Sequence, residues 1–283
     1  MTFMEMAISA QRYLPHSLLD IATHKSCSTF GKTRSRFVKS RFMKKYKIDW
    51  QASRKCKNSK TFNECVDRFD TINDIFSRKI DPALTVPKAT GTYDIISPAQ
   101  CYARKVSAKE EFFIKKAKYN LSTLLNTTTV PATSDIFIFR LAPEQYHRFH
   151  SPTTSTIVSI VEKKGTYKSV NPILLNKIPV LQGNYRKIVT FSNGIKMVIV
   201  GATCVGSILL NVKKGDRVKH GDDMGAFEFG GSCIAIVVPY IIKKYNKKIT
   251  VNENILQPGD WVCRWAPSKI EYKTRKNINK NRN

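Results

Sequence analysis

The apolar residues near the start of the chain recur at helical spacing, with basic and polar residues between them. Two stretches carry this pattern: SRFVKSRFMKKYKIDW, with Phe37, Phe42, Met43 and Tyr46, and TFNECVDRFDTINDIFSRKI, with Val66, Phe69, Ile72, Ile75 and Phe76. A spacing of three to four residues places side chains on one face of a helix. We therefore predict that residues 1–85 form a mostly helical region.

Beyond Pro82 and Pro87 the apolar residues instead form short β-branched runs bounded by turn-forming residues, a pattern typical of strands. The runs are GTYDIISPA, DIFIFRLA, STIVSIVEKKG, KIVTFSNGIKMVIVGATCVGSILLNVKKGDRV and SCIAIVVPYIIKKY. The SNG between KIVTF and IKMVIV predicts a hairpin turn. KKGDRVKHGDDMG predicts a second tight turn, and YNLSTLLN one short helix. The predicted fold class is α+β: a helical, basic N-terminal region over 1–85 followed by a β-rich domain over 86–283.

The net charge narrows the choice of partners. The chain carries 48 Lys and Arg against 21 Asp and Glu, a formal charge of +27. Residues 32–60 hold twelve of these cations against the single acid Asp49, and the tail KIEYKTRKNINKNRN holds a second cluster. Such a surface favours polyanions, either nucleic acid or an anionic membrane. No nucleic-acid-binding module accompanies the charge, so we expect no nucleic-acid partner.

The aromatic residues among these cations leave two interpretations open. A basic helix with an aromatic stripe suits a membrane interface, but the same stripe would also pack a helix onto the body of the protein. No apolar run reaches the 18 residues that a membrane span needs, and the N-terminus lacks the basic and apolar blocks of a signal peptide. We therefore expect an intracellular protein that attaches peripherally to a membrane.

The seven cysteines, at positions 27, 56, 65, 101, 204, 233 and 263, are odd in number and include no Cys-x-x-Cys pair. We predict neither a zinc site nor a disulfide framework, which favours a reducing compartment. Two of the five histidines, His147 and His150, lie three residues apart in YHRFHSP. A turn at this spacing could present both rings to one cavity. A metal site would need further ligands at recognisable spacing, so no metal is expected, and taken alone the pair also fits a structural role.

The segment FEFGGSCIAIVVP places Gly230, Gly231 and Ser232 directly before an apolar run. The glycines could form an ordinary bulge or turn, or they could keep the backbone accessible for chemistry. A serine that follows glycine can attack the carbonyl of its own preceding peptide bond if a histidine takes its proton, and glycine leaves that carbonyl uncrowded. The resulting ester can eliminate and hydrolyse, which cuts the chain and leaves an N-terminal pyruvoyl group. A pyruvoyl ketone can serve as the electron sink of a decarboxylation.

A series of segments follows in order over roughly residues 35–240: TINDIFSRKIDP, IISPA, FIKKAKYNLSTLL, LAPEQYHRFHSP, YKSVNP, GNYRKIVTF, VGATCVGSI and GDDMGAFEFGGS. Together they resemble the phosphatidylserine decarboxylase family. The resemblance implies a pyruvoyl-dependent decarboxylase that converts phosphatidylserine in an anionic membrane to phosphatidylethanolamine, without a metal. It also suggests a homodimer.

The resemblance further implies roles for individual residues. Self-cleavage between Gly231 and Ser232 would divide the decarboxylase domain into a large and a small chain, and Ser232 would become the pyruvoyl group. His150 would be the base that activates Ser232 during maturation. His147 would lie beside the substrate and assist decarboxylation or protonation of the carbanion. An imidazole titrates in a range suited to both tasks.

The chain departs from the family at Gln100, in the segment SPAQC. The resemblance places an Asp there, which would orient the maturation histidine like the third member of a serine-protease triad. In the protease, amide for carboxylate costs about 10⁴-fold in rate. Nearby acids that could substitute are Asp94, Asp222, Asp223 and Glu228. The alternative to the decarboxylase is therefore an uncleaved, non-catalytic lipid-binding relative.

Overall fold

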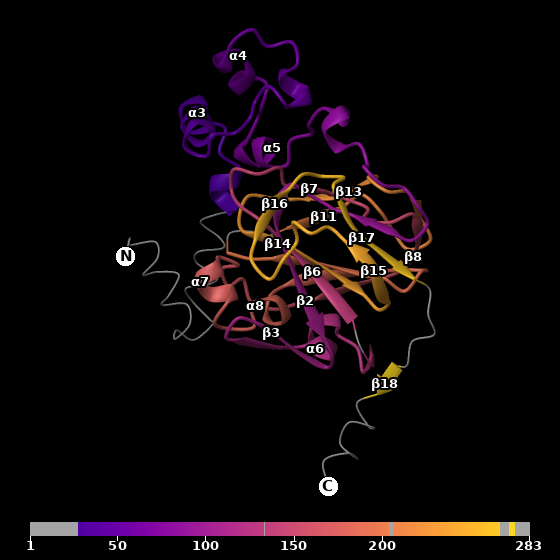
Figure 1. The fold of residues 1–283 in the computed structure, drawn as a ribbon. Helices are drawn as coiled ribbons and strands as arrows, with labels where there is room; N and C mark the ends of the chain where they lie inside the picture. The colour runs from indigo at the N-terminus through magenta and orange to yellow at the C-terminus, as the bar shows by residue number, and fades with distance from the viewer. Residues whose placement is uncertain (1–27, 133, 204–206, 267–271, 275–283) are drawn as a thin grey trace.

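The computed structural model describes residues 28–132, 134–203, 207–266 and 272–274. Short helices near the N-terminus lie at one end of a β-rich body (Figure 1). The α+β class, with a helical N-terminal region followed by a β-rich body, is confirmed. Residues 1–27 of the predicted helical region, most of the basic tail, Cys27 and Cys204 lie outside the described residues.

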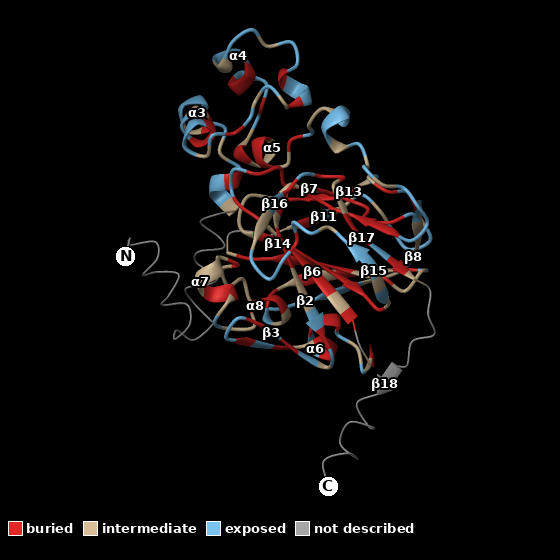
Figure 2. Ribbon diagram, in the orientation of Figure 1, coloured by how far each residue is buried: buried red, intermediate tan, exposed pale blue. Residues whose placement is uncertain are grey.

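The body is built on one sheet of eight strands, all paired antiparallel. Their order is β12 (Arg217–Val218), β8 (Ser155–Lys163), β9 (Arg186–Phe191), β10 (Lys196–Gly201), β14 (Ser232–Val238), β6 (Ser134–Leu141), β2 (Cys101–Ala108) and β16 (Asn254–Leu256). The predicted hairpin is confirmed, because β9 pairs with β10 and Gly194 adopts a φ of 80° in the turn. β14 lies between β10 and β6, and all seven of its residues are buried (Figure 2).

Alternate residues of the central strands face two separate hydrophobic cores, as the period of two in a strand requires. On β6, Phe137 and Phe139 belong to the larger core, and Ile136 and Ile138 belong to the smaller one. The larger core includes residues of two three-stranded sheets: β11 (Ile208–Leu210), β13 (Asp223–Phe227) and β7 (Arg148–His150), and β1 (Asp94–Ile96), β17 (Trp261–Ala266) and β15 (Ile241–Tyr245).

The smaller core is closed by a hairpin and three short helices on the far side of the sheet (Figure 1). These elements are β3 (Glu111–Ile114), β4 (Ala117–Asn120), α6 (Leu121–Leu125), α7 (Pro172–Leu175) and α8 (Val180–Gly183). A further strand, β5 (Thr129–Pro131), pairs with β18 (Tyr272–Thr274). The short helix predicted from YNLSTLLN is α6, which is capped by the side chain of Asn120.

The N-terminal region contains α3 (Arg36–Lys45), η1 (Arg54–Cys56), α4 (Phe62–Asp67), α5 (Ile72–Phe76) and η2 (Pro82–Thr85). Its second periodic stretch forms two short helices rather than one continuous helix, because each has its own N-cap. Thr61 accepts a hydrogen bond from the backbone of Glu64, and Thr71 forms a capping box with Asp74. A Thr followed three residues later by an acid is the sequence signature of such a start.

The aromatic stripe of α3 mostly faces the protein interior. Phe42 and Met43 are buried in the larger core and Tyr46 packs against it, whereas Phe37 is 73% exposed. The cations of residues 32–60 are all exposed except Lys39, whose ammonium group donates to the carbonyl of Phe69. The helix therefore packs on the body with one face and presents positive charge with the other. No helix within the described residues is long and apolar enough to span a bilayer.

The prediction that the cysteines form no disulfide framework was wrong. Cys56 and Cys65 form a disulfide, with Cα atoms 5.0 Å apart. Their separation of nine residues matches no motif, but the fold brings the end of η1 against α4 and buries both residues. Cys101, Cys233 and Cys263 are free and buried. The cysteine pattern thus no longer argues for a reducing compartment.

Candidate active site

Ser232 is the first residue of β14, at the junction where the chain leaves β13 and enters the central sheet. It pairs with Gly201 of β10 and Leu141 of β6, and it is fully buried. Its Oγ has no hydrogen-bond partner among the described residues. A buried hydroxyl without a partner is costly, and such a group in a folded protein is often retained for a chemical role. The Gly-Gly-Ser segment therefore connects two strands and does not interrupt one.

The peptide bond before Ser232 is fixed by two backbone contacts. The Gly231 N–H donates to the carbonyl of Thr203 at 2.9 Å, and the Gly231 carbonyl accepts the N–H of Ala202 at 3.0 Å. A donor on this oxygen would stabilise the negative charge that develops when the carbonyl is attacked. A Cβ at position 231 would lie 3.3 Å from the Cβ of Ala202, which is a tight contact. Gly231 therefore lets the carbonyl approach its donor closely.

His147 lies directly before β7 and is completely buried. Its Nδ1 lies 2.9 Å from the carbonyl oxygen of Gln145, so Nδ1 carries the proton and Nε2 is the free acceptor. This Nε2 has no hydrogen-bond partner among the described residues. Phe76 of α5 covers the ring, with a centroid separation of 3.7 Å. Burial lowers the pKa of His147 to about 3, so the ring is neutral at pH 7.

His150, the last residue of β7, has a different set of partners. Its Nδ1 donates to the carbonyl of Gly221 at 2.9 Å, and its Nε2 accepts the hydroxyl of Tyr146 at 3.1 Å. Burial lowers the pKa of His150, and the hydrogen bond to Gly221 and the nearby Asp223 carboxylate offset part of that effect. The ring is thus a neutral base, with its tautomer set by a backbone carbonyl.

The side chains of His147, His150 and Ser232 make no hydrogen bond with one another. β7 pairs with β13, and His150 is in register with Asp223. The carbonyl of His147 accepts the N–H of Phe227, five residues before Ser232. The Ser232 hydroxyl nonetheless bonds to neither imidazole. Within the described residues, no cluster of three or more His, Cys, Asp or Glu is arranged to hold a metal.

Gln100 does not orient His150. Its Oε1 accepts the backbone N–H of Tyr146 at 2.9 Å, so it anchors the start of the double-histidine segment. The tautomer of His150 is instead set by the carbonyl of Gly221, which carries a dipole and no charge. Asp223 lies closest in register, but its carboxylate pairs with Arg148 at 2.5 Å.

The other candidate acids are also engaged in contacts of their own. Asp94 binds Arg264 and Trp261, which holds the pKa of Asp94 below its usual value, chiefly through the Arg264 hydrogen bond. Asp222 accepts the backbone N–H of Lys219. The carboxylate of Glu228 accepts the side-chain amide of Asn73. None of them contacts a ring nitrogen of His150.

Three residues of the site escaped the sequence interpretation. Ala202 and Gly221 contribute only backbone groups, and side-chain patterns carry no signal for such contacts. Asn73 contacts Glu228 and Phe229, although it precedes them by about 155 residues in the sequence. It lies within TINDIFSRKIDP, a segment that shares the family's pattern, so the resemblance marked the segment but not the contact.

Known proteins resemble this chain over more than half of its length. The family model described as phosphatidylserine decarboxylase matches residues 72–259, more than half of the chain. Phosphatidylserine decarboxylase proenzyme 2 of Saccharomyces cerevisiae is 34% identical over 196 residues, which cover 65% of this chain and 17% of the yeast protein. The phosphatidylserine decarboxylase proenzyme of Clostridium botulinum strain Hall is 32% identical over 211 residues, which cover 70% of this chain and 67% of the bacterial protein.

The proenzyme of Ruminiclostridium cellulolyticum is 33% identical over 189 residues, which cover 62% of this chain and 63% of that protein. Among solved structures, a deep-sea M23 metalloprotease aligns with a TM-score of 0.26 at 13% identity, over 65% of this chain and 100% of the metalloprotease, which is too low to indicate a shared fold. The match to the family model extends from α5 to the end of the β16–β17 turn and includes both histidines and Ser232. The chain belongs to the phosphatidylserine decarboxylase family.

Proposed function

We propose that this chain is a decarboxylase proenzyme that cleaves itself between Gly231 and Ser232 and then acts on phosphatidylserine. The observation that carries the proposal is the junction itself. A buried serine hydroxyl without a partner among the described residues adjoins a glycine carbonyl that already accepts the N–H of Ala202. Family membership supplies the reaction class, and the geometry of this junction suits attack by the hydroxyl on the preceding carbonyl.

The proposed cleavage begins when the Ser232 oxygen bonds to the Gly231 carbonyl carbon, the C–N bond breaks, and the nitrogen of Ser232 takes up a proton. Loss of the Ser232 α-proton then expels the ester oxygen, so that Gly231 leaves as a carboxylate and residue 232 becomes an enamine. Water hydrolyses the enamine to a ketone and releases ammonia. The large chain ends at Gly231, and the small chain begins with the pyruvoyl group.

The two imidazoles divide the proton transfers. We assign His150 as the base for Ser232, because its Nδ1 proton is fixed by the Gly221 carbonyl and its Nε2 lone pair accepts only the buried hydroxyl of Tyr146 among the described residues. Cleavage requires Nε2 to exchange this hydroxyl for that of Ser232. We assign His147 to the decarboxylation step, because its Nε2 has no partner among the described residues and its lowered pKa keeps the ring neutral.

The pyruvoyl group fits this position. Residue 232 begins a central strand and is held on both sides by β10 and β6, so the ketone would be fixed in the sheet. Once formed there, the group would supply the electron sink for loss of a carboxylate next to a substrate amine. His147, covered by Phe76, would then hold or return a proton at its Nε2 in a water-poor site.

The substrate assignment rests on the relatives. The chain spans 17% and 20% of the length of the Saccharomyces cerevisiae and Komagataella phaffii proenzymes, so activity on phosphatidylserine is carried over only from the shared segment. The exposed cations of residues 32–60 support it, since an anionic membrane would attract them. We also propose that the chain attaches to the membrane through this surface, binds no nucleic acid and forms a homodimer.

The test is the state of the purified chain. A denaturing gel of the wild type should show two fragments in place of the 32.2 kDa chain, and intact mass should show residue 232 as pyruvoyl. Ser232→Ala should stay whole and release no carbon dioxide from phosphatidylserine vesicles. A wild-type chain that stays whole after prolonged incubation would refute the proposal and favour an uncleaved lipid-binding relative. Cleavage without release of carbon dioxide would refute the substrate assignment alone.

A further inference from the structure

The segment directly upstream of the proposed cleavage bond is held by one side chain from the helical region. Asn73 of α5 accepts the backbone N–H of Phe229 through its Oδ1 at 3.0 Å. Its Nδ2 donates to a carboxylate oxygen of Glu228 at 3.3 Å. A side-chain amide is a neutral group that both accepts and donates, so Asn73 can bind a backbone donor and a carboxylate acceptor at once.

The amide of Asn73 is closely packed on the side that faces Gly31. A Cβ at Gly31 would lie 2.5 Å from its Oδ1, so a glycine is what leaves room for the amide. The ring of Phe229 is packed as well, among the rings of Phe30, Phe42 and Phe76 with centroid separations of 5.1, 5.6 and 5.5 Å. The helical region thus fixes both the backbone and the side chain two residues before the bond.

The two residues that form the bond are fixed by different contacts. The N–H and carbonyl of Gly231 bind the backbones of Thr203 and Ala202, and Ser232 enters the central sheet. Between the two anchors lies Gly230 with a φ of 145°, a conformation that residues with a side chain rarely adopt. The scissile bond is therefore held from both directions, with a single permissive residue between the anchors.

We propose that Asn73 is a positioning residue for self-cleavage. By holding residues 228 and 229, it keeps the Gly231 carbonyl on the Ala202 N–H and at the angle that the Ser232 hydroxyl needs. The inference rests on the proposed self-cleavage. It gives the helical region a function in the cleavage site, in addition to the membrane attachment proposed for it above.

The experiment follows the rate of cleavage of newly made chain in four variants and one control variant. Asn73→Ala should slow cleavage about 10- to 100-fold, the size of effect expected when a reacting group is displaced by about 1 Å. Asn73→Asp should be similarly slow, because its carboxylate would face that of Glu228. Glu228→Gln alone should cleave within about threefold of wild type, since its amide oxygen still accepts from Asn73.

The double variant Asn73→Asp with Glu228→Gln is the decisive one. The introduced carboxylate at position 73 would accept both the Phe229 N–H and the introduced amide at position 228. The contact is then rebuilt with its polarity reversed, and cleavage should return to within about threefold of wild type. Ser77→Ala, which removes a hydroxyl bonded to the backbone carbonyl of Asn73, is the matched control at the end of the same helix and should cleave normally. Thermal unfolding in the Ser232→Ala background measures the folded state of each variant without cleavage.

The outcomes separate the two proposals. A wild type that never cleaves refutes the proposed function and this inference with it. If the wild type cleaves and Asn73→Ala cleaves at the same rate, this inference alone is refuted. The inference is also refuted if Asn73→Asp cleaves slowly and the added Glu228→Gln does not restore the rate. A merely structural role of Asn73 would lower the melting temperature and would show no charge-specific rescue.

Discussion

The β-rich body and the helical region bury their side chains in different ways. Every residue of β14 is buried, because the strand lies in the middle of a sheet with a core on each face. The helices bury one face each and expose nearly all of their cations. Helices of ten residues or fewer are marginal on their own, so they depend on the larger core that they share with the body.

This contrast indicates a division of tasks between the two regions. The body fixes Ser232 and supplies both histidines, and its strands leave those groups little freedom. The helical region contacts the same site through Asn73 and Phe76, and its outer face exposes cations to solvent. The body is thus expected to govern stability, and the helical region to govern positioning and attachment.

A cavity in the central strand should have the greatest effect on stability. Ile236→Ala should lower the free energy of unfolding by about 2–5 kcal/mol, because Ile236 is fully buried in the larger core. Urea unfolding in the uncleaved Ser232→Ala background would measure it. The same truncation at exposed Phe37 should change stability by no more than about 0.5 kcal/mol. Equal losses at the two positions would contradict the division.

The disulfide should stabilise the helical region alone. Removing the Cys56–Cys65 bond should reduce stability by about 2–3 kcal/mol, from the chain entropy of a short loop. Hydrogen exchange with and without reductant should show lost protection in α3 to α5, with β14 and β6 unchanged. A Cys56→Ala/Cys65→Ala chain should not respond to reductant. Loss of protection throughout the body would show that the two regions unfold as one unit.

Acid should weaken the body through its buried histidine. His147 in the unfolded chain takes up a proton near pH 6.5, whereas burial lowers the pKa of the folded group to about 3. The unfolded state therefore binds more protons between these values, and stability falls as the pH is lowered through that window. The loss should be about 2 kcal/mol at pH 5 relative to pH 7. His147→Gln should remove this part of the pH dependence; an unchanged slope would show that another group is responsible.

The contrast between the regions also shows what sequence could predict. Apolar runs and their turns predicted β6, β8, the β9–β10 hairpin and β14. The run is continuous in β6 and β14 because those strands are buried on both faces, whereas β8 is mostly half-buried or exposed and was marked by its β-branched residues. The break between α4 and α5 was also readable, since Thr71 and Asp74 have the spacing of a capping box. The pattern did not show that the helices and the body share one core, which is decided by long-range packing.

The site was predicted in its residues and not in its contacts. Motif order pointed to His147, His150 and Ser232, but the Nδ1 of each ring donates to a backbone carbonyl, and no residue pattern encodes such a contact. Gln100 was expected at the orienting position, and its amide instead binds the backbone of Tyr146. The sequence showed that Gln100 departs from the family pattern. It did not show that the carbonyl of Gly221 orients His150 instead.

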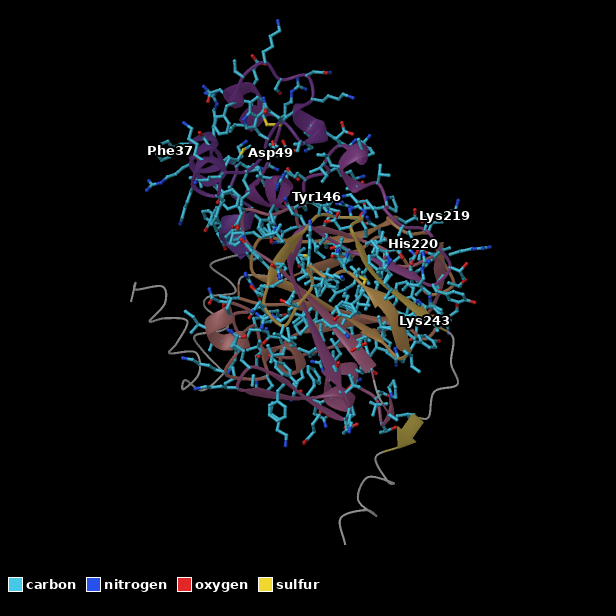
Figure 3. The ribbon with its side chains drawn as sticks, viewed as in Figure 1. Phe37, Asp49, Tyr146, Lys219, His220 and Lys243 are labelled. Carbon is cyan, nitrogen blue, oxygen red and sulfur yellow. A yellow bond between two sulfur atoms is a disulfide. The ribbon has the colours of Figure 1, made fainter. Side chains whose placement is uncertain are left out.

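A weaker effect is expected when the helical region attaches to an anionic surface. Phe37, Arg41 and Lys45 follow one another at intervals of four residues along α3, so they share a face, and all three are exposed. Such a face offers one apolar anchor and two cations to a bilayer. In the view of Figure 3, Phe37 lies at the upper left on the helical region and Lys243 at the right side of the β-rich body, with Tyr146 between them. Lys243 on β15 is therefore a control of equal charge at a distant place.

Arg41→Gln should weaken binding to phosphatidylglycerol vesicles about fivefold, because a cation near an anionic bilayer contributes about 1 kcal/mol. Those vesicles are anionic and lack the serine carboxylate, so binding is measured apart from turnover. Lys243→Gln should change the vesicle affinity by less than about twofold, since a charge on the far side is screened over about 10 Å of salt solution. If both variants lose affinity equally, only net charge matters, and the helical region has no privileged part in attachment.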